Sequence, residues 1–229
     1  MQQNDYIAVF DSGIGGTSVL KQLQQLMPNE RYLYFGDHKN APYGSRPTSQ
    51  VRKLTLDAAE MLMSYGCKAL VVACNTATSA AIHLLRERYP DKVIVGIEPA
   101  LKPAVEAFPQ GHIGIMATQV TLREEKLAHQ LERFPEATVY LIPAPGLVEL
   151  IEKNEPTEAL LTPILSPYKG KLDGLVLGCT HYPFAAETIS RLLPGTVLFD
   201  GGPGTARQTQ RLLMEKDLLN PGPGETTFL

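Results

Sequence analysis

The sequence predicts an α/β fold of two pseudo-twofold-related, three-layer lobes, each with a mainly parallel β-sheet between helices. The first observation behind this prediction is a set of short runs that are apolar throughout, such as residues 70–73 and 175–177. A strand covered by helices on both faces is continuously hydrophobic, whereas a strand with one wet face alternates. The second observation is that stretches with helical periodicity separate these runs, which is typical of βα units.

The third observation is a repeat between the two halves of the chain. Residues 113–116 (I-G-I-M) follow residues 7–10 (I-A-V-F) by 106 positions (113 − 7), and Cys179 follows Cys74 by 105 (179 − 74). Regular strand spacing alone does not put a cysteine at the same strand end in both halves. We therefore expect a duplicated pair of lobes with the active site in the cleft between them. The expected lobes are residues 1–98 plus 205–229 and residues 99–204.

Alternating strands and helices make up the expected first lobe. Its apolar runs predict strands at residues 7–10, 32–36, 69–73 and 93–97. Helical periodicity predicts helices at residues 17–26, 54–65 and about 79–89. Pro28 lies just beyond the first helix and cannot continue it. Pro99 and Pro103 mark the crossing into the second lobe.

The expected second lobe repeats this pattern of apolar runs. Its predicted strands are residues 113–116, 139–142, 175–177 and 197–199. A last helix at residues 205–214 lies beyond the final strand, and we expect it to return to the first lobe. The tail at residues 220–229 is loop-like, with room for a short final strand.

Composition narrows the class of protein. The chain has 229 residues, 44% hydrophobic and 20% charged, which is ordinary for a globular protein. A net charge of −3 and a pI near 6.0 give no basic footprint, so we expect no nucleic-acid partner. No apolar stretch approaches the ~18 residues of a membrane span, and the amino terminus shows no secretory signal. Three cysteines do not suit a disulfide framework, so we expect a reducing, cytoplasmic location without membrane association.

Residues 11–16 (D-S-G-I-G-G) join the first predicted strand to the first predicted helix. Backbone N–H groups and the helix dipole make such a loop a cradle for an anion. Two plainer interpretations stay open: a tight glycine turn without a ligand, and an Asp11 that only caps the helix. The loop lacks the full dinucleotide fingerprint, so we do not expect NAD.

Cys74 and Cys179 each end a predicted strand, and polar residues follow them, 75–76 (Asn-Thr) and 180–181 (Thr-His). Two thiols on opposite faces of one carbon could remove a proton from one side and deliver a proton to the other, which inverts a stereocentre. No lysine lies in these segments to hold pyridoxal phosphate, so we expect a route without a cofactor. The base must be a thiolate, which needs neighbours that favour the charged form.

Other interpretations of these cysteines remain open. Cys67 has no polar neighbours and is interpreted as a core residue. Cys179 and His181 have the spacing of a C-x-H metal pair, but zinc needs four ligands and no matching set is visible, so we expect no metal. A Cys-His hydrolase or decarboxylase would use Cys179 alone. A protein that only binds an amino acid or a protein partner is the non-enzymatic alternative.

Six motifs occur in order along nearly the whole chain: D-S-G-I-G-G at 11–16, G-D-x₄-P-Y-G at 36–44, A-C-N-T-A-T at 73–78, I-E-P at 97–99, I-G-I-M-A-T-x-x-T at 113–121 and L-G-C-T-H-Y-P at 177–183. Through them the chain resembles the cofactor-independent aspartate/glutamate racemase family. Members that act on aspartate usually have C-N-T-A-H and G-C-T-E. Thr78 and His181 stand at those places here, so the resemblance favours glutamate as the substrate.

The resemblance also implies residue roles. Cys74 would take the proton from D-glutamate and Cys179 from L-glutamate, each with the other thiol as the acid. Asp11 would assist Cys74, and Glu152 with His181 would assist Cys179. Asp37 is a further carboxylate that the family places near the site. The implied substrate contacts are Asp11, Ser12, Pro42, Tyr43, Gly44, Asn75, Thr76, Thr118, Thr121, Thr180 and His181.

The implied biological role is the supply of D-glutamate for bacterial peptidoglycan, with glutamate as the partner molecule and a homodimer left open. Two departures from the family pattern matter. Glu149 replaces the proline usual before the assisting glutamate, so either Glu149 or Glu152 could face the site. His38 stands where threonine is more usual.

Overall fold

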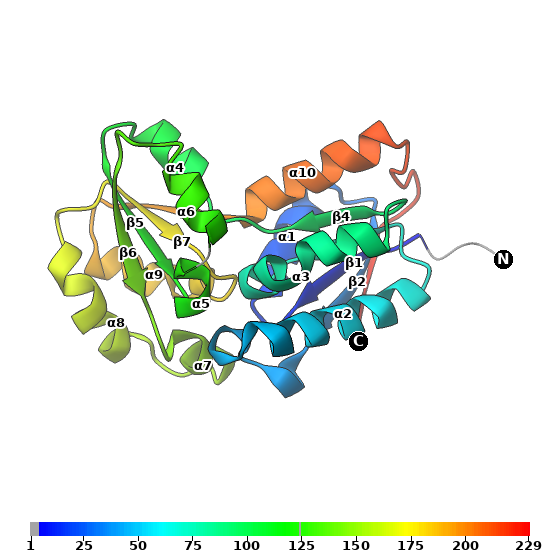
Figure 1. Cartoon of the computed structure of the whole chain (residues 1–229), viewed down its shortest axis with the longest axis horizontal. Coiled ribbons are helices and arrows are strands. Elements are labelled where there is room, and N and C mark those ends of the chain that lie inside the picture. The colour runs from blue at the N-terminus through cyan, green and yellow to red at the C-terminus, as the bar shows by residue number, and fades with distance from the viewer. Residues whose placement is uncertain (1–4, 124) are drawn as a thin grey trace. The chain divides into compact units, whose positions relative to one another are not determined.

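The computed structural model describes residues 5–123 and 125–229 and divides into two compact units (Figure 1). The first unit contains the described residues of Met1–Glu98 and Gly202–Leu229, and the second is Pro99–Gly201. The chain re-enters the first unit at Gly202, three residues before Thr205, the point of return that the sequence predicts. The difference arises because the last helix begins at Gly202.

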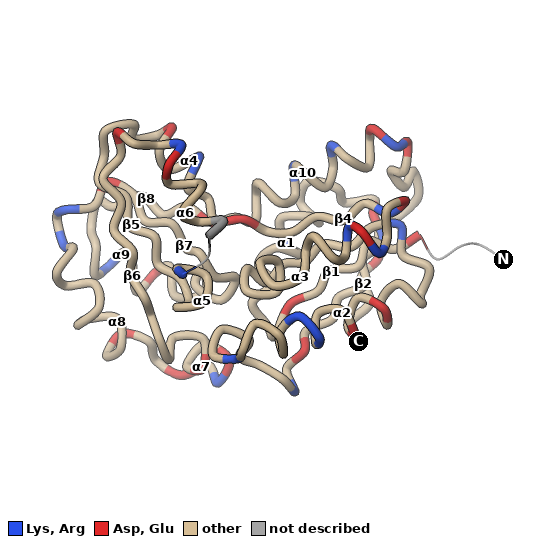
Figure 2. The backbone as a smooth tube through the Cα atoms, viewed as in Figure 1, with Lys and Arg blue, Asp and Glu red and all other residues tan. Residues whose placement is uncertain are grey.

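A five-stranded sheet with the order β4-β3-β1-β2-β9 forms the centre of the first unit, and all neighbouring strands are parallel. Its strands are β1 (Ile7–Asp11), β2 (Arg31–Gly36), β3 (Ala69–Val72), β4 (Val93–Gly96) and β9 (Glu225–Phe228). The short final strand expected in the tail is therefore confirmed. Strands β3 and β4 contain no charged residue, and Figure 2 shows the charged residues mainly on helices and loops.

Helices cover both faces of this sheet. Helices α1 (Gly16–Leu26) and α10 (Gly202–Glu215) pack on the face that carries Ile7 and Val9. Helices α2 (Thr48–Ser64) and α3 (Asn75–Arg88) pack on the face that carries Ala8 and Phe10. Successive residues of a strand point to opposite faces, so a sheet between two helical layers needs apolar residues at both. The return of α10 to the first unit confirms the sequence prediction.

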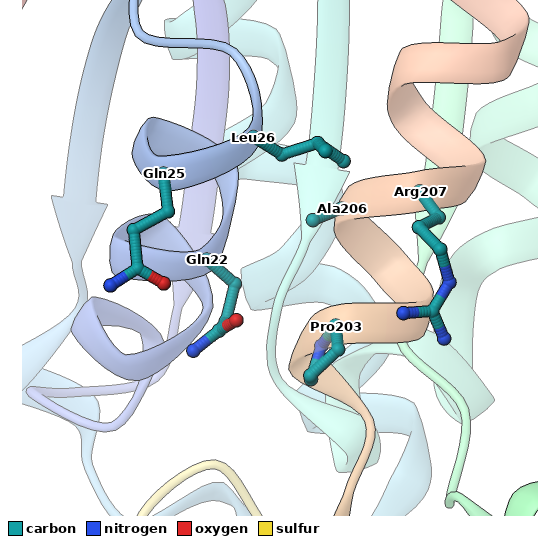
Figure 3. A pocket seen from close by; sticks show the side chains of 6 residues that line it. All are labelled: Gln22, Gln25, Leu26, Pro203, Ala206 and Arg207. Carbon is teal, nitrogen blue, oxygen red and sulfur yellow. The ribbon is translucent and has the colours of Figure 1, made fainter.

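Helices α1 and α10 lie side by side and leave a shallow groove of about 250 Å³ between them (Figure 3). The residues that line the groove are Gln22, Gln25, Leu26, Pro203, Ala206 and Arg207. None of the site residues predicted from the sequence lines it. Gln25 and Arg207 are exposed and Gln22 is partly buried, so the groove belongs to the outer helical layer of the unit.

The second unit has a four-stranded sheet of order β6-β5-β7-β8, again parallel throughout. Its strands are β5 (His112–Ala117), β6 (Thr138–Pro143), β7 (Gly174–Leu177) and β8 (Val197–Asp200). Its helices are α4 (Leu101–Ala107), α5 (Gln119–Leu122), α6 (Glu125–Leu131), α7 (Leu147–Glu152), α8 (Glu158–Leu165) and α9 (Ala186–Leu192). Helices α4 and α6 pack with Ile113, Ile115 and Val176 on one face. Each unit thus has the predicted layered α/β architecture with a parallel sheet.

Like α10, helices α2 and α3 of the first unit start several residues earlier than the sequence predicts. Helix α2 begins at Thr48 rather than residue 54, directly after Pro47. Helix α3 begins at Asn75 rather than near residue 79, because the side chain of Cys74 accepts a hydrogen bond from the N–H of Ala77 and so caps the helix. Cysteine is not a usual capping residue, so the sequence pattern placed this start one turn too late.

A buried ion pair ties the carboxyl-terminal segment to the first unit. Lys68 Nζ lies 2.7 Å from Glu30 Oε2, and both side chains are almost fully buried. Lys68 also donates to the carbonyl oxygen of Leu218, and Glu30 accepts from the N–H of Asn220. This arrangement fixes the segment that leads into β9.

Among the described residues, no helix has the length and apolar character needed to cross a bilayer.

Candidate active site

Three chemically active side chains of the first unit follow neighbouring parallel strands. Asp11 ends β1, Asp37 follows β2, and Cys74 lies two residues beyond β3. In the strand register, Asp11 pairs with Gly36, and Phe10 pairs with Val72. The carboxyl ends of parallel strands meet at one edge of the sheet, so these side chains gather there.

The thiol of Cys74 occupies the N-cap of α3, a helix of 14 residues. Its sulfur accepts from the N–H of Ala77 at 3.4 Å, and its S–H donates to Oγ of Ser12 at 3.6 Å. The side chain is nearly buried, with 6% of its surface exposed. A helix N-terminus favours negative charge at the capping position, so this environment suits a thiolate.

The loop after β1 is held in one conformation by hydrogen bonds. Asp11 is fully buried, and its Oδ1 accepts from the N–H of Gly13 at 2.9 Å. The N–H of Asp37 donates to the carbonyl oxygen of Asp11 at 2.9 Å, which links the ends of β1 and β2. A methyl group at Gly16 would lie 2.4 Å from Cβ of Asp11, so only glycine fits there. The loop therefore presents Asp11 and Ser12 in fixed positions.

A second loop contributes Asp37, Asn40 and Tyr43. The hydroxyl of Tyr43 donates to Oδ2 of Asp37 at 2.8 Å, and the amide of Asn40 donates to both carboxylate oxygens at 3.0 and 3.1 Å. Burial raises the pKa of Tyr43 well above its usual value, and the hydrogen bond to Asp37 adds to the effect. Tyr43 is therefore a permanent hydrogen-bond donor at neutral pH. Pro42 and Gly44 flank it in the same loop and are partly buried.

Asn75 and Thr76 form the first turn of α3, and both are buried. The side-chain oxygen of Asn75 is a buried acceptor that has no hydrogen-bond partner in the structure. Burying an acceptor without a hydrogen bond is unfavourable for folding, unless a ligand or water supplies a donor. The Asn75 amide therefore points to a bound group with an N–H or O–H. We call the six residues Asp11, Ser12, Asp37, Tyr43, Cys74 and Asn75 the first cluster.

The second unit has its own line of hydrogen-bonded groups beside a thiol. Cys179 lies two residues beyond β7, and its Sγ is 3.8 Å from Nδ1 of His181. Nε2 of His181 lies 2.5 Å from Oε1 of Glu152, which stands at the end of α7. His181 is almost fully buried. An imidazole held between a carboxylate and a thiol can carry a proton between them.

The structure distinguishes between the two glutamates of α7. Glu152 bonds to His181, whereas Glu149 is exposed in the first turn of the helix. Gly146 precedes α7 with φ of 85°, a conformation that favours glycine and sets where the helix begins. The hydroxyl of Tyr182 donates to the carbonyl oxygen of Ala144 just before that turn, at 3.4 Å. Glu152 is thus the carboxylate beside the second thiol.

The remaining predicted residues of the second unit lie at the same sheet edge. Thr118 follows β5, whose neighbour is β7, and its Oγ1 caps α5 by accepting from the N–H of Thr121 at 3.3 Å. The two hydroxyl groups lie 3.1 Å apart, so these threonines also bond to each other. Thr180 is buried next to Cys179. We call the four residues Cys179, Thr180, His181 and Glu152 the second cluster.

Cys67 differs from the other two cysteines. It lies before β3, at the opposite end from Cys74, and is buried in the apolar core. Burial raises its pKa to about 11, so it stays a neutral thiol near pH 7. The interpretation of Cys67 as a core residue is confirmed.

Among the described residues, no three His, Cys, Asp or Glu side chains are grouped so as to hold a metal ion.

Some residues of the first cluster's surroundings were not predicted from the sequence. Asn40 holds the carboxylate of Asp37, and the hydroxyl of Tyr34 donates to the carbonyl oxygen of Gly13 at 2.6 Å. Asn40 occupies one of the unspecified positions of the motif at 36–44, and Tyr34 lies two residues before that motif. Neither has a sequence signal of its own, because each acts through a contact that only the folded chain makes.

Comparisons with known proteins show which chains this one resembles. A protein-family model described as Asp/Glu/Hydantoin racemase matches residues 14–209. A glutamate racemase of Clostridium kluyveri is 50% identical over 216 residues, covering 91% of this chain and 84% of that protein. A glutamate racemase of Clostridium perfringens is 45% identical over 223 residues, covering 94% and 86%.

Solved structures show the same similarity. The Escherichia coli glutamate racemase in complex with L-glutamate and the activator UDP-MurNAc-ala has a TM-score of 0.86 at 33% identity, covering 92% of this chain and 82% of that one. The Francisella tularensis glutamate racemase in complex with D-glutamate has a TM-score of 0.84 at 31% identity, covering 99% and 88%.

Proposed function

The chain belongs to the Asp/Glu/hydantoin racemase family, and from that premise we propose that it interconverts L-glutamate and D-glutamate without a cofactor. The observation that carries the proposal is that each unit places a thiol just beyond a strand end, among hydrogen-bonded polar groups. Cys74 has Ser12 and the α3 N-terminus, and Cys179 has His181 with Glu152. The relatives with the highest similarity among those described are glutamate racemases, which are isomerases.

In the proposed reaction the two thiols act on opposite faces of one substrate carbon. With D-glutamate bound, the Cys74 thiolate takes the α-proton, and the electron pair of the broken Cα–H bond moves into the α-carboxylate. The S–H of Cys179 then delivers its proton to the other face of Cα, and L-glutamate is formed. The enzyme is left with a Cys74 thiol and a Cys179 thiolate, ready for the reverse reaction. Protons and charge therefore balance over one turnover.

The neighbours of each thiol support these roles. The N-cap of α3 favours a thiolate at Cys74, and the fixed carboxylate of Asp11 lies in the same cluster to handle a proton. His181 can hold a proton between Glu152 and Cys179. Backbone and hydroxyl donors at these strand ends would stabilise the charge that develops on the substrate carboxylate.

The substrate contacts that we propose follow the family motifs. The partnerless side-chain oxygen of Asn75 suits the α-ammonium group of an amino acid, which has three N–H donors. Tyr43, Pro42 and Gly44 supply a loop beside it. Ser12, Thr76, Thr180 and His181 offer donors for the two carboxylates, and Thr118 and Thr121 are weaker candidates because they bond to each other. We further propose that the D-glutamate formed in the cytoplasm supplies peptidoglycan synthesis.

The test is to follow L- and D-glutamate interconversion by circular dichroism, with aspartate as the control substrate. The proposal expects glutamate to racemise from either enantiomer and aspartate to react much more slowly. In deuterated water, solvent deuterium should appear at the α-carbon of both enantiomers. Stable optical rotation of both glutamate enantiomers over long incubation would overturn the proposal.

A second candidate is a hydrolase or decarboxylase that uses Cys179 alone. The observation that favours it is the Cys179–His181–Glu152 line, which has the order of a nucleophile, base and orienting acid. The two candidates differ in their use of the other thiol. Replacement Cys74→Ser should nearly abolish racemisation, whereas a hydrolase or decarboxylase that uses Cys179 alone should keep its full activity in this variant.

A further inference from the structure

Two tyrosines of β2, Tyr32 and Tyr34, project from the same face of the strand into the core beneath α1. Both are buried, and both hydroxyl groups donate to backbone carbonyl oxygens. Tyr32 bonds to Leu23 and Met27 at the end of α1, at 2.9 Å each. Tyr34 instead bonds to Gly13 at 2.6 Å, in the loop of the first cluster. The two side chains are chemically alike, but only one contacts the site.

Gly13 connects Tyr34 to Asp11. Its carbonyl oxygen accepts from Tyr34, and its N–H donates to Oδ1 of Asp11 at 2.9 Å. The space around this residue is closed, since a methyl group at Gly36 would lie 2.6 Å from the Gly13 oxygen. A methyl group at Gly16 would lie 3.0 Å from the Tyr34 hydroxyl. Gly13 is therefore held by one hydrogen bond on each side and by close packing.

We propose that Tyr34 is a positioning residue for the reaction, because its hydroxyl fixes Gly13 and, through the Gly13 N–H, the carboxylate of Asp11. Ser12 lies between Asp11 and Gly13 in the chain, and its hydroxyl oxygen accepts a hydrogen bond from the thiol of Cys74. The hydroxyl of Tyr34 thus determines the surroundings of Cys74 without touching the substrate. This inference rests on the proposed racemase function, since it assigns Tyr34 to one thiol of the pair.

The carboxyl-terminal end of the chain, at and just after β9, also contacts Tyr34. The N–H of Leu229 donates to the carbonyl oxygen of Tyr34 at 3.0 Å, and the rings of Phe228 and Tyr34 lie 5.4 Å apart. Phe228 keeps 62% of its surface exposed, so little of its contribution is burial. Its contact instead limits the positions open to the Tyr34 ring.

The matched variants Tyr34→Phe and Tyr32→Phe test the inference. Each removes one buried hydroxyl from the same face of the same strand, so both should lower the thermal midpoint to a similar extent. Only Tyr34→Phe should lower kcat, by about tenfold to hundredfold, because small misplacement of catalytic groups costs about that much. KM should change much less, since the substrate contacts proposed outside this loop, from Asn75, Thr76 and Thr180, remain.

Isotope effects give a readout that a purely structural role would not move. The two enantiomers have equal free energies, so kcat/KM must change by the same factor in both directions. Cys74 breaks the Cα–H bond of D-glutamate, and Cys179 breaks that of L-glutamate. If Tyr34→Phe slows only the Cys74 step, the effect of α-deuteration should rise for D-glutamate and fall for L-glutamate. Tyr32→Phe should leave both effects as in the parent protein.

A measurement without turnover separates this inference from the proposed function. Alkylation by iodoacetamide, followed by mass spectrometry of the cysteine peptides, gives the rate at Cys74 alone. Tyr34→Phe should change that rate severalfold relative to the rate at Cys179, whereas Tyr32→Phe should not. Equal Cys74 rates in the two variants would overturn the inference. Absence of racemisation by the parent protein would instead overturn the proposed function, and the alkylation result would still decide the role of Tyr34.

Discussion

The carboxylate of Glu152 lies 2.5 Å from Nε2 of His181, while the other ring nitrogen of His181 faces the sulfur of Cys179. This relationship connects the end of α7 to the strand end after β7 and defines the second cluster. Glu149, on the same helix, is exposed instead, which supports the proposal that Glu152 is the site carboxylate. A buried imidazole between two partners can hold a proton or pass it from one to the other.

Replacement Glu152→Gln should lower kcat about tenfold to a thousandfold, because the amide cannot stabilise a protonated His181. The measurement is racemisation of each glutamate enantiomer by circular dichroism. Glu149→Gln is the matched control on the same helix and should stay within about twofold of the parent. A larger loss for Glu149→Gln than for Glu152→Gln would contradict the assignment.

Tyr43→Phe should weaken substrate binding and lower kcat/KM about tenfold, because it removes a buried donor from the carboxylate of Asp37. Steady-state kinetics with D-glutamate give the size of the loss. Tyr65→Phe, a change at an exposed tyrosine of the same unit, is the control and should have no effect. Unchanged kinetics in Tyr43→Phe would show that the Asp37 loop keeps its position without the hydrogen bond.

Cys67 should make stability depend on pH in the alkaline range. Its pKa is raised from 9.0 to about 11 by burial, so the folded chain keeps a proton that the unfolded chain releases. The stabilisation is complete below pH 9 and is lost as pH rises towards 11, by about 1–3 kcal/mol. Urea unfolding at several pH values should show a steeper decline for the parent than for Cys67→Ala. Parallel declines in the two proteins would contradict this pKa shift.

Removal of one partner of the buried Lys68–Glu30 ion pair should be strongly destabilising. Replacement Lys68→Met leaves a buried carboxylate without its cation and should lower the free energy of unfolding by about 3–5 kcal/mol. Lys53→Met removes an exposed pair with Asp57 and should cost less than about 1 kcal/mol. Denaturant titration of both variants gives the comparison, and equal losses would show that burial of the pair is unimportant.

The sequence predicted those features that depend on local pattern. Continuous apolar runs located the strands around Cys74 and Cys179, and chain order placed α10 back on the first unit. The start of α3 was missed because a thiol, rather than a usual capping residue, accepts the Ala77 N–H. Periodicity also could not separate Glu149 from Glu152, since residues three apart share one side of a helix.

Contacts between segments that are distant in the chain could not be predicted from the sequence. Tyr34 and Gly13 are 21 residues apart, and Lys68 and Leu218 are 150 apart. Nothing in the local pattern of either residue indicates its partner, because such pairs form only when strand order and register are fixed. The carbonyl of Gly13 could receive its hydrogen bond only where β1 and β2 lie side by side.

The two thiols should leave different isotopic signatures when each is removed alone. In Cys74→Ser, Cys179 can still take the α-proton of L-glutamate and return a solvent proton to the same face. Cys74→Ser should therefore exchange deuterium into L-glutamate, while its rate of racemisation falls about a thousandfold. Cys179→Ser should do the reverse and exchange deuterium into D-glutamate only. Proton NMR of the α-position in deuterated water follows both exchanges at once. Exchange into the same enantiomer in both variants would mean that both sulfurs serve one face of the substrate, and the two-base reaction would then be wrong.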